Sequence, residues 1–212
     1  MQSVSLWLGN RLFLLVLRLR PLFEKGLYMA AGATIYKANV DISDIDRGYY
    51  ANHVITLARH PSETEERLAI RLLTFCLFAG VVHARLEFGR GLSTDGDAAL
   101  WEIDDTGSIA RWIEVGTPDV KTVRRSAGRS DEVIVVAYGE DRIGPWWQQV
   151  CADMNKVQKL SVATISDAEV EQLAKLMKRT MQLTVTVQDG VTWLSDSENT
   201  AQVQLGWLLR RE

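Results

Sequence analysis

The chain has little of what usually builds a metal centre or a disulfide-bonded fold. It contains two cysteines in 212 residues, Cys76 and Cys151, both inside apolar stretches and neither in a CxxC or Cys/His pattern. Its three histidines are scattered, and no pair has the H-x-x-x-H spacing that places two ligands on one helical turn. We therefore expect free, buried thiols in a reducing cytosol and no zinc site.

The chain also lacks an apolar run of membrane-spanning length. The run at residues 12–19 is too short to cross a bilayer, and it is interrupted by arginine and followed by proline before any signal-peptide cleavage site. Met29 then opens a stretch that is typical of an ordered strand. We expect translation to begin at Met29, with residues 1–28 an extension outside the fold, residues 29–212 a single domain, and no membrane partner.

Neither sign of charge is in large excess. The formal net charge is -3 and the pI is near 5.7, so the surface as a whole does not attract phosphate, and nucleic-acid binding would need a local basic patch. With 47% hydrophobic residues, the chain can bury one substantial core, and no shift in composition marks a linker.

Strand-like and helix-like patterns succeed one another along the chain. Strands are expected where apolar residues alternate or run continuously, and helices where they recur at helical spacing. The expected strands are 33–42, 49–59, a hairpin around the turn at 104–107, 131–139, 160–165, a hairpin turning at Asp189-Gly190, and 201–209; the expected helices are 63–78, one after Thr117, 145–154 and 166–179, with a loop at 85–97. This order predicts an α/β fold with helices on both faces of a mixed sheet.

Capping residues signal three helix starts. Ser62 and Ser166 each precede a glutamate by three residues, which is the capping-box pattern. Thr117 precedes Pro118, a residue that suits the first position of a helix.

The hairpin that turns at 104–107 carries one carboxylate before its first strand and another near the end of its second strand. Asp97, or less favourably Asp95, lies before the hairpin, and Glu114 lies late in its second strand. Converging carboxylates can hold Mg²⁺, and a nearby lysine can steady the charge that develops in phosphodiester attack. Lys121 is the candidate lysine. The alternative is that Glu114 only pairs with the basic helix that follows.

This constellation resembles the core of the PD-(D/E)XK nucleases, in which Pro-Asp precedes one strand and (Asp/Glu)-x-Lys ends the next. The sequence departs from that pattern at two places. Ala98 and Ala99 stand where Pro-Asp is expected, so Asp97 would supply the first carboxylate. Gly116 stands at the lysine position, so Lys121 would supply the cation.

Longer blocks resemble the YaeQ family. They are TIYKA at 34–38, LARHPSETEER at 57–67, RLEFGRGLSTD at 85–95, DDTGSIARWIEVGTPDVKTVRRSAGR at 104–129, Trp146-Trp147, and TVQDGVTWLSD at 186–196. The resemblance extends from about Thr34 to about Leu205. It implies a bacterial protein with one domain that is a variation of the restriction-endonuclease-like (PD-(D/E)XK) core, with no established activity for the family. Many members look to have Pro-Asp or Pro-Glu where this chain has Ala98-Ala99.

The resemblance also suggests roles for charged residues outside the hairpin. In PD-(D/E)XK folds a glutamate on the helix before the hairpin can point at the active site, and Glu66 or Glu63 would fill that role. The alternative is that both remain solvated at the helix N-terminus. Arg90, between two glycines, could bind phosphate or pair with Glu87.

A basic arc follows Glu114 in the sequence. Lys121, Arg124, Arg125 and Arg129 fall on one side of the expected helix and are the candidate phosphate contacts, although a charged helix face is usually only solvated.

Two functional hypotheses result. In the first, a cytoplasmic protein binds nucleic acid, with weak or absent Mg²⁺-dependent phosphodiester hydrolysis. In the second, a non-catalytic module on the same scaffold contacts another protein through Trp146 and Trp147. These two residues are adjacent, so on a helix they cannot both face the core.

Overall fold

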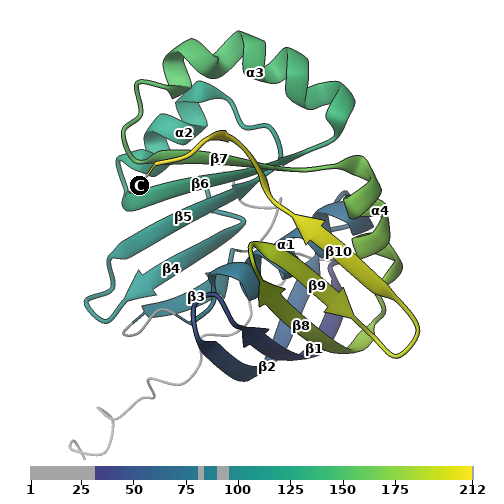
Figure 1. The fold of residues 1–212 in the computed structure, drawn as a ribbon. Coiled ribbons are helices and arrows are strands. Elements are labelled where there is room, and N and C mark those ends of the chain that lie inside the picture. Colours follow the sequence, from purple (N-terminus) through teal and green to yellow (C-terminus); the bar gives the residue numbers. More distant parts are fainter. Residues whose placement is uncertain (1–31, 81–83, 90–95, 212) are drawn as a thin grey trace, which may run out of the picture.

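The computed structural model describes residues 32–80, 84–89 and 96–211 (Figure 1). These residues form two β-sheets and four α-helices. The structure confirms the predicted α/β fold, but it has two mixed sheets where the sequence predicted one. Within the described ranges, no helix is both long enough and apolar enough to cross a bilayer.

The smaller sheet has five strands in the order β10-β9-β8-β1-β2. They are β1 (Thr34–Asp44), β2 (Tyr49–Arg59), β8 (Thr180–Gln188), β9 (Val191–Ser195) and β10 (Thr200–Gln204). β1 and β8 run parallel, and the other neighbours are antiparallel. The β8–β9 hairpin turns at Asp189 and Gly190 as predicted, and both residues have the positive φ that this tight turn requires.

The larger sheet has six strands in the order β11-β7-β6-β5-β4-β3. They are β3 (Ala84–Phe88), β4 (Leu100–Asp104), β5 (Ile109–Val115), β6 (Ser130–Tyr138), β7 (Leu160–Ile165) and β11 (Gly206–Leu209). β5, β6 and β7 are parallel, whereas β3, β4 and β5 form an antiparallel meander.

The helices divide between the two faces of the six-stranded sheet (Figure 1). They are α1 (Glu65–Phe78), α2 (Val120–Ala127), α3 (Glu140–Met154) and α4 (Asp167–Lys175). One apolar cluster joins α1, α4 and the five-stranded sheet to one face, and a second packs α2 and α3 against the other. The six-stranded sheet therefore has helices on both faces, as predicted.

The N-terminus of α1 differs from the predicted capping box. Thr64, not Ser62, caps the helix, and its hydroxyl accepts a hydrogen bond from Arg67 N. The physical reason lies at Glu63, which is buried against arginines of α1 and therefore cannot occupy the first exposed turn.

The other two helix starts have different outcomes. α2 is capped by Asp119 rather than Thr117, because the carboxylate accepts a hydrogen bond of 2.6 Å from a first-turn N–H, and a charged acceptor makes the stronger bond. α4 begins at the predicted capping box of Ser166 and Glu169.

Two segments pair differently from the prediction. Residues 84–88 form strand β3 rather than a loop, and the C-terminal run is divided between both sheets as β10 and β11. A side-chain carbon at Gly206 would lie 2.5 Å from Thr164 Oγ1, so glycine allows β11 to approach β7. Both free cysteines were expected to be buried; Cys76 is buried and Cys151 is half-buried.

Candidate functional site

Glu114 lies near the end of β5, where the chain leaves the six-stranded sheet for α2. It shares a sheet face with Trp112, whose Nε1 donates a hydrogen bond of 2.7 Å to Glu114 Oε1. Burial raises the pKa of the Glu114 carboxyl above 4.5, whereas the Trp112 bond and the guanidinium groups of Arg67 and Arg125 oppose that rise. One N–H group therefore already donates to this carboxyl group, and two arginines lower its pKa through their positive charge.

Arg67 connects Glu114 to a buried set of charges that we call the α1 ion cluster: Glu63, Arg67 and Arg71. Glu63 Oε1 accepts a bond of 2.6 Å from Arg67 Nη1, and both Glu63 oxygens lie within 3.1 Å of Arg71 Nη1. Glu63 and Arg71 are each 1% exposed. Arg71 also donates to two backbone carbonyl oxygens. The cluster is thus built into the fold rather than open to solvent.

The second set of cations lies on the surface of α2. Lys121, Arg125 and Arg129 are exposed and four residues apart, so they form a line along the helix and past its end. Within the part of the chain that the structure describes, none of the three has a hydrogen-bond or ion-pair partner. We call these three residues the α2 cationic stripe. Arg124 differs, because its Nη2 lies 2.9 Å from Asp153 Oδ1 on α3.

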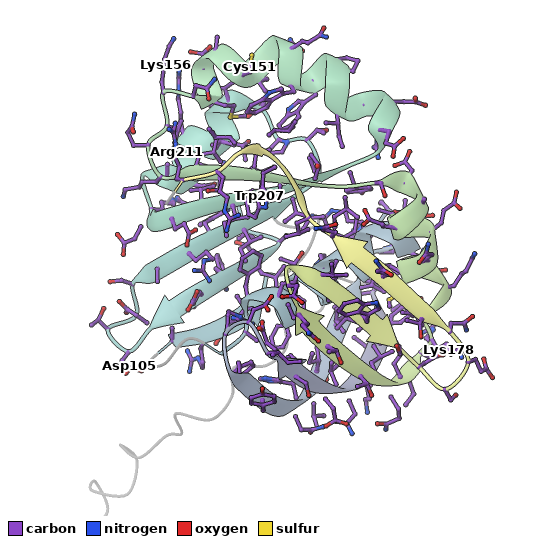
Figure 2. The ribbon with its side chains drawn as sticks, viewed as in Figure 1. Asp105, Cys151, Lys156, Lys178, Trp207 and Arg211 are labelled. Atoms are coloured by element: carbon purple, nitrogen blue, oxygen red, sulfur yellow. The ribbon has the colours of Figure 1, made fainter. Side chains whose placement is uncertain are left out.

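Asp97 lies just before β4 and lines a cavity of about 810 Å³, which we call the α2 cavity. A side-chain carbon at Gly96 would lie 3.5 Å from the Arg125 guanidinium, so this segment lies against the α2 cationic stripe. Glu114 does not line the cavity. Its aromatic and charged lining residues are Asp97, Trp101, Asp104, Trp112, Arg129, Asp131 and Lys159. The turn of the β4–β5 hairpin, next to Asp105 in Figure 2, contributes to the lining.

The predicted Mg²⁺ site depends on Asp97 and Glu114, and the donor set in this conformation does not fit that ion. Mg²⁺ requires oxygen ligands in near-octahedral geometry. Glu114 Oε1 already accepts the Trp112 N–H, two guanidinium groups place positive charge near this carboxyl group, and Asp97 lines a cavity that Glu114 does not line. Among the described residues, no three His, Cys, Asp or Glu side chains are grouped to hold an ion. A Mg²⁺ ion here, with Lys121 as its catalytic cation, stays a prediction.

Glu66, the other residue predicted to be catalytic, lines a different cavity. This cavity of about 510 Å³ lies where α1, α3 and α4 begin, and none of the other residues predicted to be catalytic or to bind metal lines it. Hydrogen bonds from its own backbone N–H and from Thr64 hold the pKa of the Glu66 carboxyl below 4.5. Glu63, the alternative glutamate, lies instead in the α1 ion cluster.

Several residues that shape this region were not singled out from the sequence. Arg67 and Arg71 follow Glu63 at successive four-residue steps, a spacing that could have indicated an ion cluster on one helix face. Lys159 had no local signal, because it reaches the α2 cavity from the start of β7. Arg90 lies outside the described residues.

The same chain matches a known family over most of its length. A family model described as YaeQ protein matches residues 29–205. The chain belongs to the YaeQ family.

Similar proteins agree with that membership. YaeQ proteins of Salmonella typhi and Escherichia coli (strain K12), both named as uncharacterized, are each 40% identical to this chain over 177 residues, which is 84% of this chain and 96% of theirs. The crystal structure of YaeQ from Xanthomonas axonopodis pv. citri is 41% identical with a TM-score of 0.79, and it covers 84% of this chain and 99% of its own. YaeQ from Pseudomonas syringae is 34% identical with a TM-score of 0.80, covering 86% and 99%. These YaeQ proteins are bacterial and share the α/β fold, and their names state no activity.

Proposed function

We propose that this YaeQ protein binds the phosphate backbone of nucleic acid along the α2 cationic stripe, on a scaffold that is a variation of the PD-(D/E)XK core. The element order α1-β3-β4-β5-α2-β6 supports the scaffold, because it places a helix before a three-stranded meander and a second helix after it. Within that order Asp97 precedes β4 and Glu114 lies near the end of β5.

The observation that carries the proposal is that Lys121, Arg125 and Arg129 make no hydrogen bond or ion pair with any of the described residues. Cations in a line that make no direct contact with a carboxylate are available to phosphate, and each phosphate contact releases a counterion from the nucleic acid. Arg124 belongs to the same predicted set, but its pairing with Asp153 leaves it a smaller share of the binding.

Binding without efficient hydrolysis follows from the chemistry around Glu114. Its carboxyl group already accepts the Trp112 N–H, and the positive charges of Arg67 and Arg125 oppose the effect of burial on its pKa. In this proposal Glu114 orients the Trp112 indole through that hydrogen bond and does not act as a nucleophile or base.

The protein-interaction hypothesis gains no support from Trp146 and Trp147. Both are half-buried against the apolar cluster of α2 and α3, and Trp146 Nε1 donates a bond of 2.9 Å to Pro118 O. Packing accounts for the pair, and a protein partner stays a prediction.

Fluorescence anisotropy with a labelled 20-nucleotide strand and its duplex, measured from low to moderate salt, tests the proposal. Changing Lys121→Gln together with Arg125→Gln should weaken binding and reduce the slope of log K against log salt by roughly 2, since about one unit is lost per phosphate contact.

The matched control is Lys175→Gln with Lys178→Gln, which removes the same charge from the opposite end of the molecule, where Figure 2 labels Lys178. The control should keep the wild-type slope. Equal losses in both double variants, or no binding of DNA or RNA to the wild type at low salt, would overturn the proposal. Mg²⁺ should not raise the melting temperature; a rise that Glu114→Gln abolishes would restore the ion site.

A further inference from the structure

The α2 cavity has an aromatic floor that the helices leave uncovered. Trp101 and Trp112 are paired neighbours on β4 and β5. Their rings pack edge to face, with the ring centroids 5.7 Å apart. α2 and α3 pack over the Trp112 end of this row, where Trp112 is 1% exposed, whereas Trp101 is half-buried. The cavity therefore exposes one indole at the margin of the covered sheet.

The two indoles differ in how they are held. Trp112 Nε1 is fixed by its hydrogen bond to Glu114, but Trp101 Nε1 is buried and has no hydrogen-bond partner among the described residues. A buried indole N–H usually has a partner. Among the described residues no hydrogen bond fixes the Trp101 indole, which is held by packing against Trp112 and the apolar cluster.

The cationic stripe leads into this cavity. Arg129, the last residue of the stripe, lines the cavity, and so does Lys159, whose Nζ donates a hydrogen bond to the carbonyl oxygen of the adjacent Ser130. A phosphate bound at Arg129 thus has an aromatic surface within the same cavity. The volume of about 810 Å³ lies in the range of about 300–1,000 Å³ that is usual for small-molecule sites.

We propose that the α2 cavity receives one unpaired base, stacked on Trp101, while Arg129 contacts its phosphate, so that single-stranded nucleic acid is the preferred partner. This inference rests on the proposed function, and it names the class of nucleic acid. In a duplex the bases are stacked and paired, so that none can reach Trp101 without being extruded. A single strand pays no such cost, and base stacking on an aromatic side chain tolerates any sequence.

Anisotropy with three labelled 12-nucleotide probes tests this inference: oligo-dT, the same strand with abasic sites throughout, and a 12-base-pair duplex. The abasic strand carries the same phosphates, so only the bases differ. Wild-type protein should bind oligo-dT roughly 5- to 150-fold more tightly than the abasic strand, which corresponds to about 1–3 kcal/mol for a stacked base. Equal affinity for the two strands overturns the inference, whatever the variants do.

Variants at Trp101 locate the stacking. Trp101→Ala should remove the preference for oligo-dT without changing the salt slope, because no phosphate contact is lost, and Trp101→Phe should restore most of it. Trp193→Phe, in the five-stranded sheet, is the control and should bind as wild type does. Near-ultraviolet circular dichroism verifies folding, and the abasic comparison needs no variant.

The outcomes separate the two proposals. If duplex and single strand bind alike and only the stripe variants weaken binding, the inference fails while the proposed function stands. If no probe binds at low salt, both fail.

Discussion

α1 and α2 both bring cations toward Glu114, and the two sets of charges are built in opposite ways. On α1, Arg67 and Arg71 are bonded to Glu63, and Glu63 and Arg71 are buried. On α2, Lys121 and Arg125 are exposed and have no ion-pair partner among the described residues. The same residue types therefore serve the fold on one helix and remain available for binding on the other.

Burial explains the difference. A charge removed from water must be paired and hydrogen-bonded, so an arginine in the core is fixed by its partners and cannot be released to a ligand. An exposed cation keeps its hydration and costs little to leave unpaired. Glu114 feels the positive charge of one arginine from each set, Arg67 and Arg125, and both oppose the rise in its pKa.

Breaking the α1 ion cluster should have the largest effect on stability. Glu63→Gln leaves Arg71 buried without its counter-charge, and removing one partner of a buried ion pair costs about 3–5 kcal/mol. Chemical denaturation of the variant should therefore show a free energy of unfolding lower by about 3 kcal/mol or more.

Two further variants control this result. Glu65→Gln lies two residues from Glu63 and removes an exposed ion-pair partner of Arg59. It should lower the free energy of unfolding by less than about 1 kcal/mol. Adding Arg71→Met to Glu63→Gln should recover part of the loss, because the fully buried cation is then gone and the remaining one, Arg67, is 14% exposed to solvent. Equal costs for Glu63→Gln and Glu65→Gln would show that the cluster does not stabilise the fold.

Titration of Glu114 should have a smaller effect, visible in the pH dependence of stability. Because burial raises its pKa in the folded state above 4.5, the folded protein binds more protons than the unfolded chain between 4.5 and the raised value. The contribution of this group is thus complete below pH 4.5 and is lost as the pH rises through the folded pKa. Glu114→Gln removes that loss.

The measurement is the difference in unfolding free energy between Glu114→Gln and wild type from pH 4 to pH 7. As the pH rises, the variant should become more stable relative to wild type, because only wild type loses the contribution of Glu114. Titrations that are common to both proteins cancel in this difference. The amide oxygen can still accept the Trp112 N–H, which keeps the packing comparable. A difference that stays constant, or shifts toward wild type, contradicts the raised pKa.

Local patterns in the sequence predicted much of the fold. The Asp189-Gly190 turn and the Ser166 capping box each depend on residues a few positions apart, and the structure confirms both. The division into two sheets could not be predicted in this way, because the parallel pairing of β1 with β8 joins residues that are distant in sequence.

The candidate site likewise contains residues that local sequence patterns predicted and residues whose positions depend on tertiary packing. The four-residue spacing of Lys121, Arg125 and Arg129 was visible in the sequence, and so was the position of Glu114 at a strand end. The resemblance suggested Glu66 or Glu63 as the glutamate of the site, and in the structure Glu66 lines a different cavity from Asp97. Which glutamate of a helix start turns inward depends on tertiary packing, and no local pattern reports it.

The smallest expected effect sharpens the comparison from the side of α2. Arg125→Glu should change the free energy of unfolding by no more than about 0.5 kcal/mol, in contrast to Glu63→Gln. Reversal replaces a like-charge pair with Lys121 by an opposite-charge pair, which favours the helix by a few tenths of a kcal/mol. It also places a negative charge in the last helical turn and near Glu114, which opposes that gain. Thermal and chemical denaturation measure the sum, and a loss as large as that of Glu63→Gln would mean that the charges of α2 hold the fold as those of α1 do.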